Sequence, residues 1–194
     1  MLKGMDLSSS LRLQAHANRL ANHRFHAALA ALTHADFHAA RTSFFPSLAA
    51  TLNHILAVDA YYIGALHGDT EIAQGYDCFV AADELQALAE RQRVSDERLI
   101  AFCGRLDAPG CDAVVLMDRS HGNIQRDLVC HVLSHLFMHQ THHRGQAHAM
   151  LAGTAVAPPQ LDEFLMPSDA PWRVADMAVL GWSESVVYGA RSST

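Results

Sequence analysis

The sequence is poor in lysine, glycine and proline, and its few cysteines form no CxxC pair; each shortage excludes a class of protein. Lys3 is the only lysine among 14 basic residues, and no cluster of basic side chains occurs, so the electrostatic footprint of a nucleic-acid-binding protein is missing. The 11 glycines and 6 prolines are too few for a collagen-like or linker-rich chain. The 4 cysteines need not form disulfides, because a chain of this length can bury a core without them.

Long hydrophobic runs are missing as well. The first residues, MLKGMDLSSSLRLQ, contain no apolar segment of the kind found in secretory signals, and no run approaches the roughly 18 residues of a membrane span. The chain has 194 residues, is 50% apolar and 18% charged, and carries a formal charge of −6, which suits one domain with a substantial core. We therefore expect a cytoplasmic protein with no membrane or nucleic-acid partner.

The apolar residues recur mostly at helical spacing and predict four long helices. Pro46 suits the first turn of the second helix, and Gly68 suits its end. Asp83 is a suitable N-cap for the third helix, and we expect the fourth to follow Asn123 and to end near Gly153. The expected ranges are residues 8–32, 46–66, 83–106 and 123–153.

Weaker signals lie between and after these helices. Residues 68–80 predict a loop, and residues 113–117 predict an extended segment, since a single strand does not make a sheet. We expect one short helix after Pro159 and another around residues 172–180. The predicted fold class is all-α: an antiparallel four-helix bundle over residues 1–166, with a short helical C-terminal extension, residues 167–194, packed on the bundle.

Histidine is the outlier of the composition, with 14 residues. In the fourth predicted helix, His139 and His143 lie one turn apart on the same apolar stripe as Leu136 and Met150. Two such imidazoles are hard to explain by packing, because charged rings repel and neutral rings need polar partners. A divalent metal would satisfy both rings; the alternative is a hydrogen-bonded pair in the core. Gln140 follows His139 where a HExxH protease motif has glutamate, which excludes that class.

A third ligand has to come from a facing helix. His54, near the middle of the second predicted helix, would complete a three-histidine site with open positions for water or substrate, although His54 alone is also explained as a histidine at the core edge. We reject His135 as a ligand, because it stands two turns, about 12 Å, from His143. His142 flanks the site and is a candidate for proton transfer or for orienting a ligand; the alternative is a surface or interhelix hydrogen bond.

Four further residues have predicted roles that follow from their positions on the helices. Asn18 and Asn22 lie one turn apart on the first predicted helix and could face the metal pocket; the alternative is an exposed polar face or an interhelix contact. We expect Asp59 to make a structural hydrogen bond or ion pair instead of binding metal. Gly145, inside the fourth predicted helix, costs about 1 kcal/mol relative to alanine and so predicts close helix packing there.

Several segments resemble the DinB family of bacterial proteins. The resemblance is carried by FFPSLAATLNHILAVDAYYIGALHGD (residues 44–69) and HLFMHQTHHRGQAHAML (135–151), with weaker matches in ANRLANHRF (17–25) and PPQLDEFLM (158–166). It implies a DinB/YfiT-like four-helix bundle that holds a divalent metal through one histidine on the second helix and two on the fourth. The matching positions are His54, His139 and His143.

The chain departs from the family pattern at positions that could line the pocket. The family often has Tyr-Asn and a tryptophan in the first helix, where this chain has Ala17-Asn18 and Leu20. It also often has asparagine before the first ligand of the fourth helix, where this chain has Met138. These departures leave the substrate preference open.

The resemblance also implies a function. Relatives in the wider superfamily include S-transferases and isomerases that use low-molecular-weight thiols such as bacillithiol or mycothiol, which implies metal-dependent thiol transfer onto a small-molecule substrate. The family name implies a damage-inducible stress protein, and the family commonly forms homodimers. The expected cofactor is zinc or nickel, with iron or manganese as alternatives. A metal-dependent hydrolase, a non-catalytic metal- or ligand-binding protein and a purely structural bundle are the other interpretations.

Overall fold

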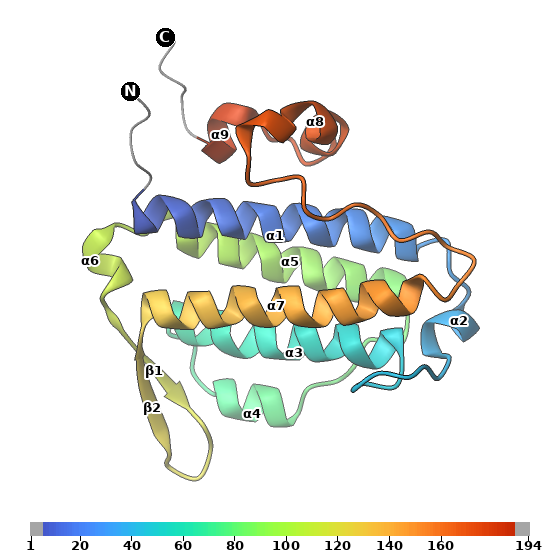
Figure 1. Ribbon diagram of the computed structural model, residues 1–194. Helices are drawn as coiled ribbons and strands as arrows, with labels where there is room; N and C mark the ends of the chain where they lie inside the picture. The colour runs from blue at the N-terminus through green and yellow to red at the C-terminus, as the bar shows by residue number, and fades with distance from the viewer. Residues whose placement is uncertain (1–5, 189–194) are drawn as a thin grey trace.

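The structure, a computed structural model, describes residues 6–188 and is mostly helical (Figure 1). The long helices are α1 (Leu7–Leu29), α3 (Leu48–His67), α5 (Leu85–Gly104) and α7 (Val129–Leu151). The shorter ones are α2 (His34–His38), α4 (Ile72–Asp77), α6 (Ala108–Cys111), α8 (Ala170–Val179) and α9 (Glu184–Tyr188), with a 3-10 turn at Pro167–Asp169. The predicted all-α class is confirmed.

Side-chain caps explain where two of the long helices begin. Asp6 accepts a hydrogen bond from the backbone N–H of Ser9 at 2.7 Å and starts α1, and Ser47 accepts one from Ala50 at 3.1 Å and starts α3. Gly68 ends α3 with a φ of +74°, which glycine adopts without strain. The cap predicted for Asp83 is wrong: Glu84 occupies that position and makes no side-chain cap.

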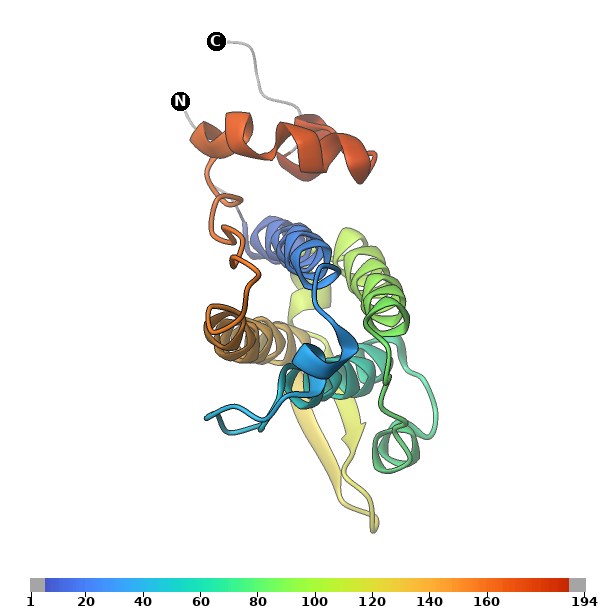
Figure 2. The same cartoon turned by 90° about the vertical axis from the view of Figure 1, so that its right-hand side faces the viewer.

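The long helices pack side by side, α1 against α5 and α7, and α3 against α5 and α7 (Figure 2). His54 meets His139, and Tyr62, further along α3, lies beside His135, which is earlier on α7. The pair α3–α7 is therefore antiparallel. Along α3 and α5 both partners advance together, from Asp59 with Gln92 to His67 with Arg98, so these two neighbours run parallel.

This parallel pair explains an element that the sequence analysis missed. The chain leaves one end of α3, which has 20 residues and so spans about 30 Å, and must return to the other end before α5 can begin. Residues 68–84 make that return, and α4 forms part of it where only a loop was expected. The antiparallel arrangement predicted for the four-helix bundle is therefore wrong for the neighbours α3 and α5, since an all-antiparallel bundle would need no such crossover.

A hairpin precedes α7 and corrects a second prediction. Strand β1 (Val114–Asp118) pairs antiparallel with β2 (Ile124–Leu128), so the helix predicted to follow Asn123 begins at Val129 instead. The chain reverses at Ser120, His121 and Gly122, whose φ angles are 67°, 54° and 76°. One face of β1 is buried through Val115 and Met117, which fixes the hairpin on the core.

A layer of buried polar side chains crosses the core. The guanidinium of Arg144 donates to the side-chain oxygens of Asn18 at 2.6 Å and Asn22 at 2.9 Å. The amide nitrogens of both asparagines donate in turn to Oδ1 of Asp96, at 3.1 and 2.9 Å. The two amides thus connect a buried cation with a buried carboxylate that it does not touch directly, and they hold α1, α5 and α7 together.

Asp59 belongs to the same layer, and its expected structural role is confirmed. It accepts hydrogen bonds from Gln92 at 2.8 Å and from Gln140 at 2.9 Å, and it is fully buried. Burial raises the pKa of Asp59 to about 7 and that of Asp96 to about 6, because an ionised carboxylate loses its hydration in the core. The positive charge of Arg144 lowers both pKa values, so the ionisation of the two carboxyl groups depends in part on Arg144.

The C-terminal part follows α7 and covers α1 (Figure 1). The short helix predicted after Pro159 is wrong, since residues 160–166 form neither helix nor strand, and α8 begins two residues before the predicted range 172–180. Met177 of α8 packs in one cluster with Leu20 and Ala21 of α1. Residues 189–194 of the expected extension lie outside the described residues. Within residues 6–188, the structure contains no helix with the length and apolar content needed to cross a membrane.

Gly145 lies on the exposed side of α7, and the close helix packing predicted there is wrong. Apart from the neighbouring backbone of α7 itself, a Cβ atom at this position would have no atom of residues 6–188 within 4 Å. We expect Gly145→Ala to raise the free energy of unfolding by about 0.5–1 kcal/mol, because alanine restricts the unfolded chain and favours the helix. Denaturant titration measures this change.

Gly64→Ala in α3 is the matched control. Its Cβ would lie 3.1 Å from Cγ2 of Ile72, so we expect a smaller gain or a loss at this position. A loss of stability in Gly145→Ala, or equal gains in the two variants, would contradict this account of the two glycines.

Candidate metal centre

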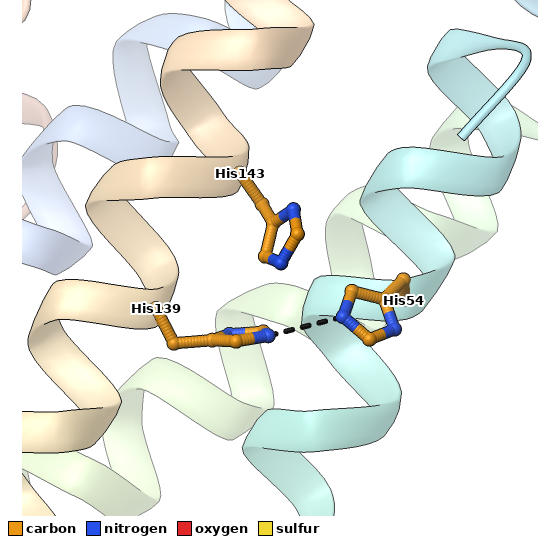
Figure 3. A group of neighbouring side chains, drawn as sticks. All are labelled: His54, His139 and His143. Atoms are coloured by element: carbon orange, nitrogen blue, oxygen red, sulfur yellow. Dashed lines mark hydrogen bonds between the residues drawn. The ribbon is translucent and has the colours of Figure 1, made fainter. Parts of the chain in front are cut away.

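Three imidazoles from two helices converge on one point, with His54 on α3 and His139 and His143 on α7 (Figure 3). One ring nitrogen from each lies within 4.8 Å of the others. The Nε2 atoms of His54 and His139 are 3.0 Å apart, and a ring nitrogen of His143 points toward them (Figure 3). The structure thus brings together the three histidines that the sequence analysis selected.

The surroundings hold these rings in place and restrict water. All three side chains are partly or fully buried, and His143 is 9% exposed. The ring of Phe45 lies 4.3 Å from that of His54 and 5.5 Å from that of His143, between ring centres. The sequence analysis assigned no role to Phe45, and the only signal for it was its place inside the segment that resembles the DinB family.

Hydrogen bonds select the atom of His143 that can bind a metal. The side-chain oxygen of Gln146 lies 2.8 Å from Nδ1 of His143, so Nδ1 carries the proton and donates it. The lone pair of Nε2 is then free, and this is the usual arrangement around a ligating histidine. Nδ1 of His139 is buried and has no hydrogen-bond partner within the described residues.

Electrostatics keeps the three rings neutral. Burial, followed by the neighbouring His143 and His54, lowers the pKa of His139 to about 4. Burial is also the main reason that the pKa of His54 and the pKa of His143 are lowered. The neighbouring His143 lowers the pKa of His54 further, and the neighbouring His142 lowers that of His143. Since neutral imidazole is the form that binds metal, the site is ready for a cation at neutral pH. Three convergent nitrogen lone pairs on half-buried rings fit a divalent transition metal.

The other predicted site residues lie outside this cluster. His142 is exposed; its ring is 4.8 Å from that of His143, and its Nε2 is 3.2 Å from the amide nitrogen of Gln146. The exposed ring of His135 is 6.3 Å from that of His139. Asn18 and Asn22 bond to Arg144 and Asp96 in the buried polar layer instead of to the three histidines.

A cavity of about 340 Å³ reaches the cluster at His139 and extends toward the β hairpin. Its walls come from α3, α4, α7 and the hairpin turn, and they combine aromatic rings with charged groups. The lining residues are Val58, Tyr61, Tyr62, Ala73, Tyr76, Asp77, Asp118, Arg119, Ser120, His135 and His139. A ligand held at the histidines therefore has room to extend in one direction, toward the hairpin.

A second group on the surface also has the geometry of a metal site. His34 and His38 of α2 each place Nε2 3.3 Å from a carboxylate oxygen of Asp83. All three of these side chains are exposed, unlike those of His54, His139 and His143. Hydrogen bonds and ion pairs to Asp83 account for this contact without a metal. The first cluster is therefore the better candidate for a resident ion.

A mostly helical protein with three convergent imidazoles between two long helices belongs to the class of candidate histidine-ligated metalloproteins. The model of the DinB family matches residues 8–174, and the chain belongs to the DinB family. The match includes all three histidines and every residue that lines the adjoining cavity. None of the curated proteins compared with the chain matches it.

Proposed function

We propose that this protein is a metal-dependent S-transferase that joins a low-molecular-weight thiol to a small electrophile, with zinc or nickel held by His54, His139 and His143. The observation that carries the proposal is the convergence of three neutral imidazoles at the end of a cavity large enough for a small molecule. A bound divalent ion would lower the pKa of a thiol and make it a nucleophile at neutral pH.

The neighbourhood of the three histidines favours a thiol over water as the nucleophile. No carboxylate is hydrogen-bonded to any of the three rings within residues 6–188. Hydrolysis usually relies on a carboxylate or similar base to take a proton from the attacking water. A thiol is more acidic than water and needs less help of this kind.

The chain's own residues account for the remaining steps. Phe45 covers one side of the rings, and the cavity on the side of His139 admits the substrate. The thiol sulfur forms a bond to the electrophilic carbon, the leaving group departs with the bonding electrons, and the thiol proton is released. We assign the transfer of that proton toward solvent to His142, which is exposed beside His143.

The test is thioether formation by the metal-loaded protein. We expect the wild-type protein to accelerate the reaction of a small thiol with an activated aryl halide, and His54→Ala to leave only the background rate. His142→Gln should lower the rate and change its pH profile while metal content stays constant. Acceleration of ester hydrolysis in place of thioether formation would support the hydrolase alternative, and tight metal binding with neither reaction would contradict catalysis.

A further inference from the structure

We propose that Arg119 binds an anionic group of the thiol, so that the preferred thiols carry a carboxylate at the end away from the sulfur. This inference rests on the proposed function and specifies its substrate. Arg119 follows β1 in the hairpin turn, and within residues 6–188 it is the only lysine or arginine that lines the cavity leading to His139. A ligand with its sulfur at the histidines would extend toward this guanidinium.

The position of Arg119 is fixed by the same helix that carries His54. Its guanidinium lies 4.9 Å from the ring centre of Tyr61 and 5.4 Å from that of Tyr62, and it donates to the hydroxyl of Tyr62 at 2.9 Å. The hydroxyl of Tyr61 donates to the backbone oxygen of Asp118 at 2.6 Å, which ties the hairpin to α3. These contacts hold the positive charge of Arg119 at the hairpin end of the cavity.

The hydrogen bonds of Arg119 go to neutral groups, namely Tyr62 and the side-chain oxygen of Gln125. No ion pair to Arg119 occurs among the residues that the structure describes. A guanidinium supplies five N–H donors in a planar fork, so donors remain for a carboxylate, and Arg119 is exposed enough to receive one.

Two carboxylates that line the same cavity as Arg119 set a limit on the ligand, in addition to Asp127, whose negative charge acts on Arg119 from β2. Asp77 accepts a hydrogen bond from the hydroxyl of Ser120 at 3.2 Å. Asp118 accepts a hydrogen bond from the backbone N–H of Ser120 at 2.8 Å. Both would repel an anion that entered without reaching the guanidinium. The arrangement therefore favours a ligand whose anionic group ends at Arg119 over one that carries negative charge along its length.

The length of the ligand follows from α3. His54 and Tyr62 are eight positions apart, which is about 12 Å along a helix. A thiol that spans this distance has a chain of several carbons, lined by Tyr76 and His135 on the way. We therefore expect short thiols such as mercaptopropionate to be too short to reach both the histidines and Arg119.

The test uses the cobalt-loaded protein and measures affinity by the thiolate-to-cobalt charge-transfer absorption. The probes are mercaptohexanoate and mercaptooctanoate, each paired with the neutral mercaptohexanol or mercaptooctanol. We expect the longer carboxylate to bind about tenfold more tightly than its neutral partner, and Arg119→Gln to abolish that difference without changing the affinity for the neutral thiols. Arg119→Lys should show part of the preference for the carboxylate thiol, because lysine keeps the positive charge but lacks the planar guanidinium that can donate two hydrogen bonds to one carboxylate.

Arg126→Gln is the matched control, because Arg126 is an exposed arginine on β2 of the same hairpin and does not line the cavity. Equal affinity for carboxylate and alcohol thiols in the wild-type protein would overturn this inference and leave the proposed function intact. Equal effects of Arg119→Gln and Arg126→Gln would overturn it too, because they indicate general charge attraction. A cobalt-loaded protein that shows no charge-transfer band with any thiol would overturn the proposed function along with it.

Discussion

Replacing His139 with alanine is expected to lower the affinity for zinc or nickel by at least about a hundredfold. His139 contributes the Nε2 atom that lies 3.0 Å from that of His54, and it lies between the other rings and the cavity. Without it, two imidazoles remain on two different helices, and the ion loses a third of its protein ligands. Elemental mass spectrometry of untagged protein purified without added metal measures the outcome.

Two control variants make this result specific. His135→Ala removes an exposed histidine one turn earlier on α7 and is expected to leave the metal content unchanged. The double variant His34→Ala/His38→Ala removes the surface group beside Asp83 and should also leave it unchanged. Loss of the ion in the double variant would move the site to the surface group. Retention of the ion in His139→Ala would show that the three convergent histidines are not its ligands.

The candidate metal centre could be predicted because its strongest signal is local. The i, i+4 spacing of His139 and His143 on an apolar stripe is a property of one helix, and helix geometry alone places the two rings side by side. The partner His54 is not local, since it lies 85 residues before His139 in the sequence. Its selection depended on a mid-helix position and on the DinB resemblance, and the packing of α3 against α7 then brings the rings together.

Elements that depend on chain direction were harder to predict. Apolar periodicity gives the buried face of a helix and says nothing about which neighbour runs parallel to it. The crossover that contains α4 follows from the parallel pair α3 and α5, so it could not be read from residues 68–84 alone. The same limit applies to β2, whose residues 124–128 are exposed or half-buried and lack the alternating pattern of a strand.

The buried polar layer shows the limit for single residues. Asn18 and Asn22 were recognised as a pair on one helical face, but their partners Asp96 and Arg144 lie more than 70 residues away in the sequence. Hydrogen-bonding asparagines on a predicted helix face fit a ligand pocket and an interhelix contact equally well. Only the packing of α1 between α5 and α7 decides between these interpretations, and it gives the two asparagines a structural contact.

Arg144→Met is expected to cause the largest loss of stability of any change considered, about 3–5 kcal/mol near pH 8. The variant removes the donor to Asn18 and Asn22, and it removes a positive charge that helps to lower the pKa of Asp59 and, together with Arg19, that of Asp96. Methionine fills much of the same space, so a cavity accounts for little of the loss. Denaturant titration at pH 5 and at pH 8 separates the electrostatic part from the rest.

The pH dependence has a definite sign. A carboxyl group whose pKa is higher in the folded than in the unfolded state binds more protons when folded, so stability falls as the pH rises from the unfolded pKa toward the folded one. In the wild-type protein this fall ends near pH 7 for Asp59 and near pH 6 for Asp96. Without Arg144 both folded pKa values rise further and the fall continues. The loss in Arg144→Met should therefore be larger at pH 8 than at pH 5.

Matched variants decide whether charge is the cause. Arg126→Met, on the exposed face of β2, should change the free energy of unfolding by no more than about 0.5 kcal/mol at either pH. Adding Asp96→Asn to Arg144→Met removes one of the two carboxyl groups on which Arg144 acts, and we expect it to reduce the difference between the two pH values. A loss in Arg144→Met that is the same at pH 5 and pH 8 would mean that Arg144 contributes packing and hydrogen bonds, and that its charge does not stabilise the buried carboxylates.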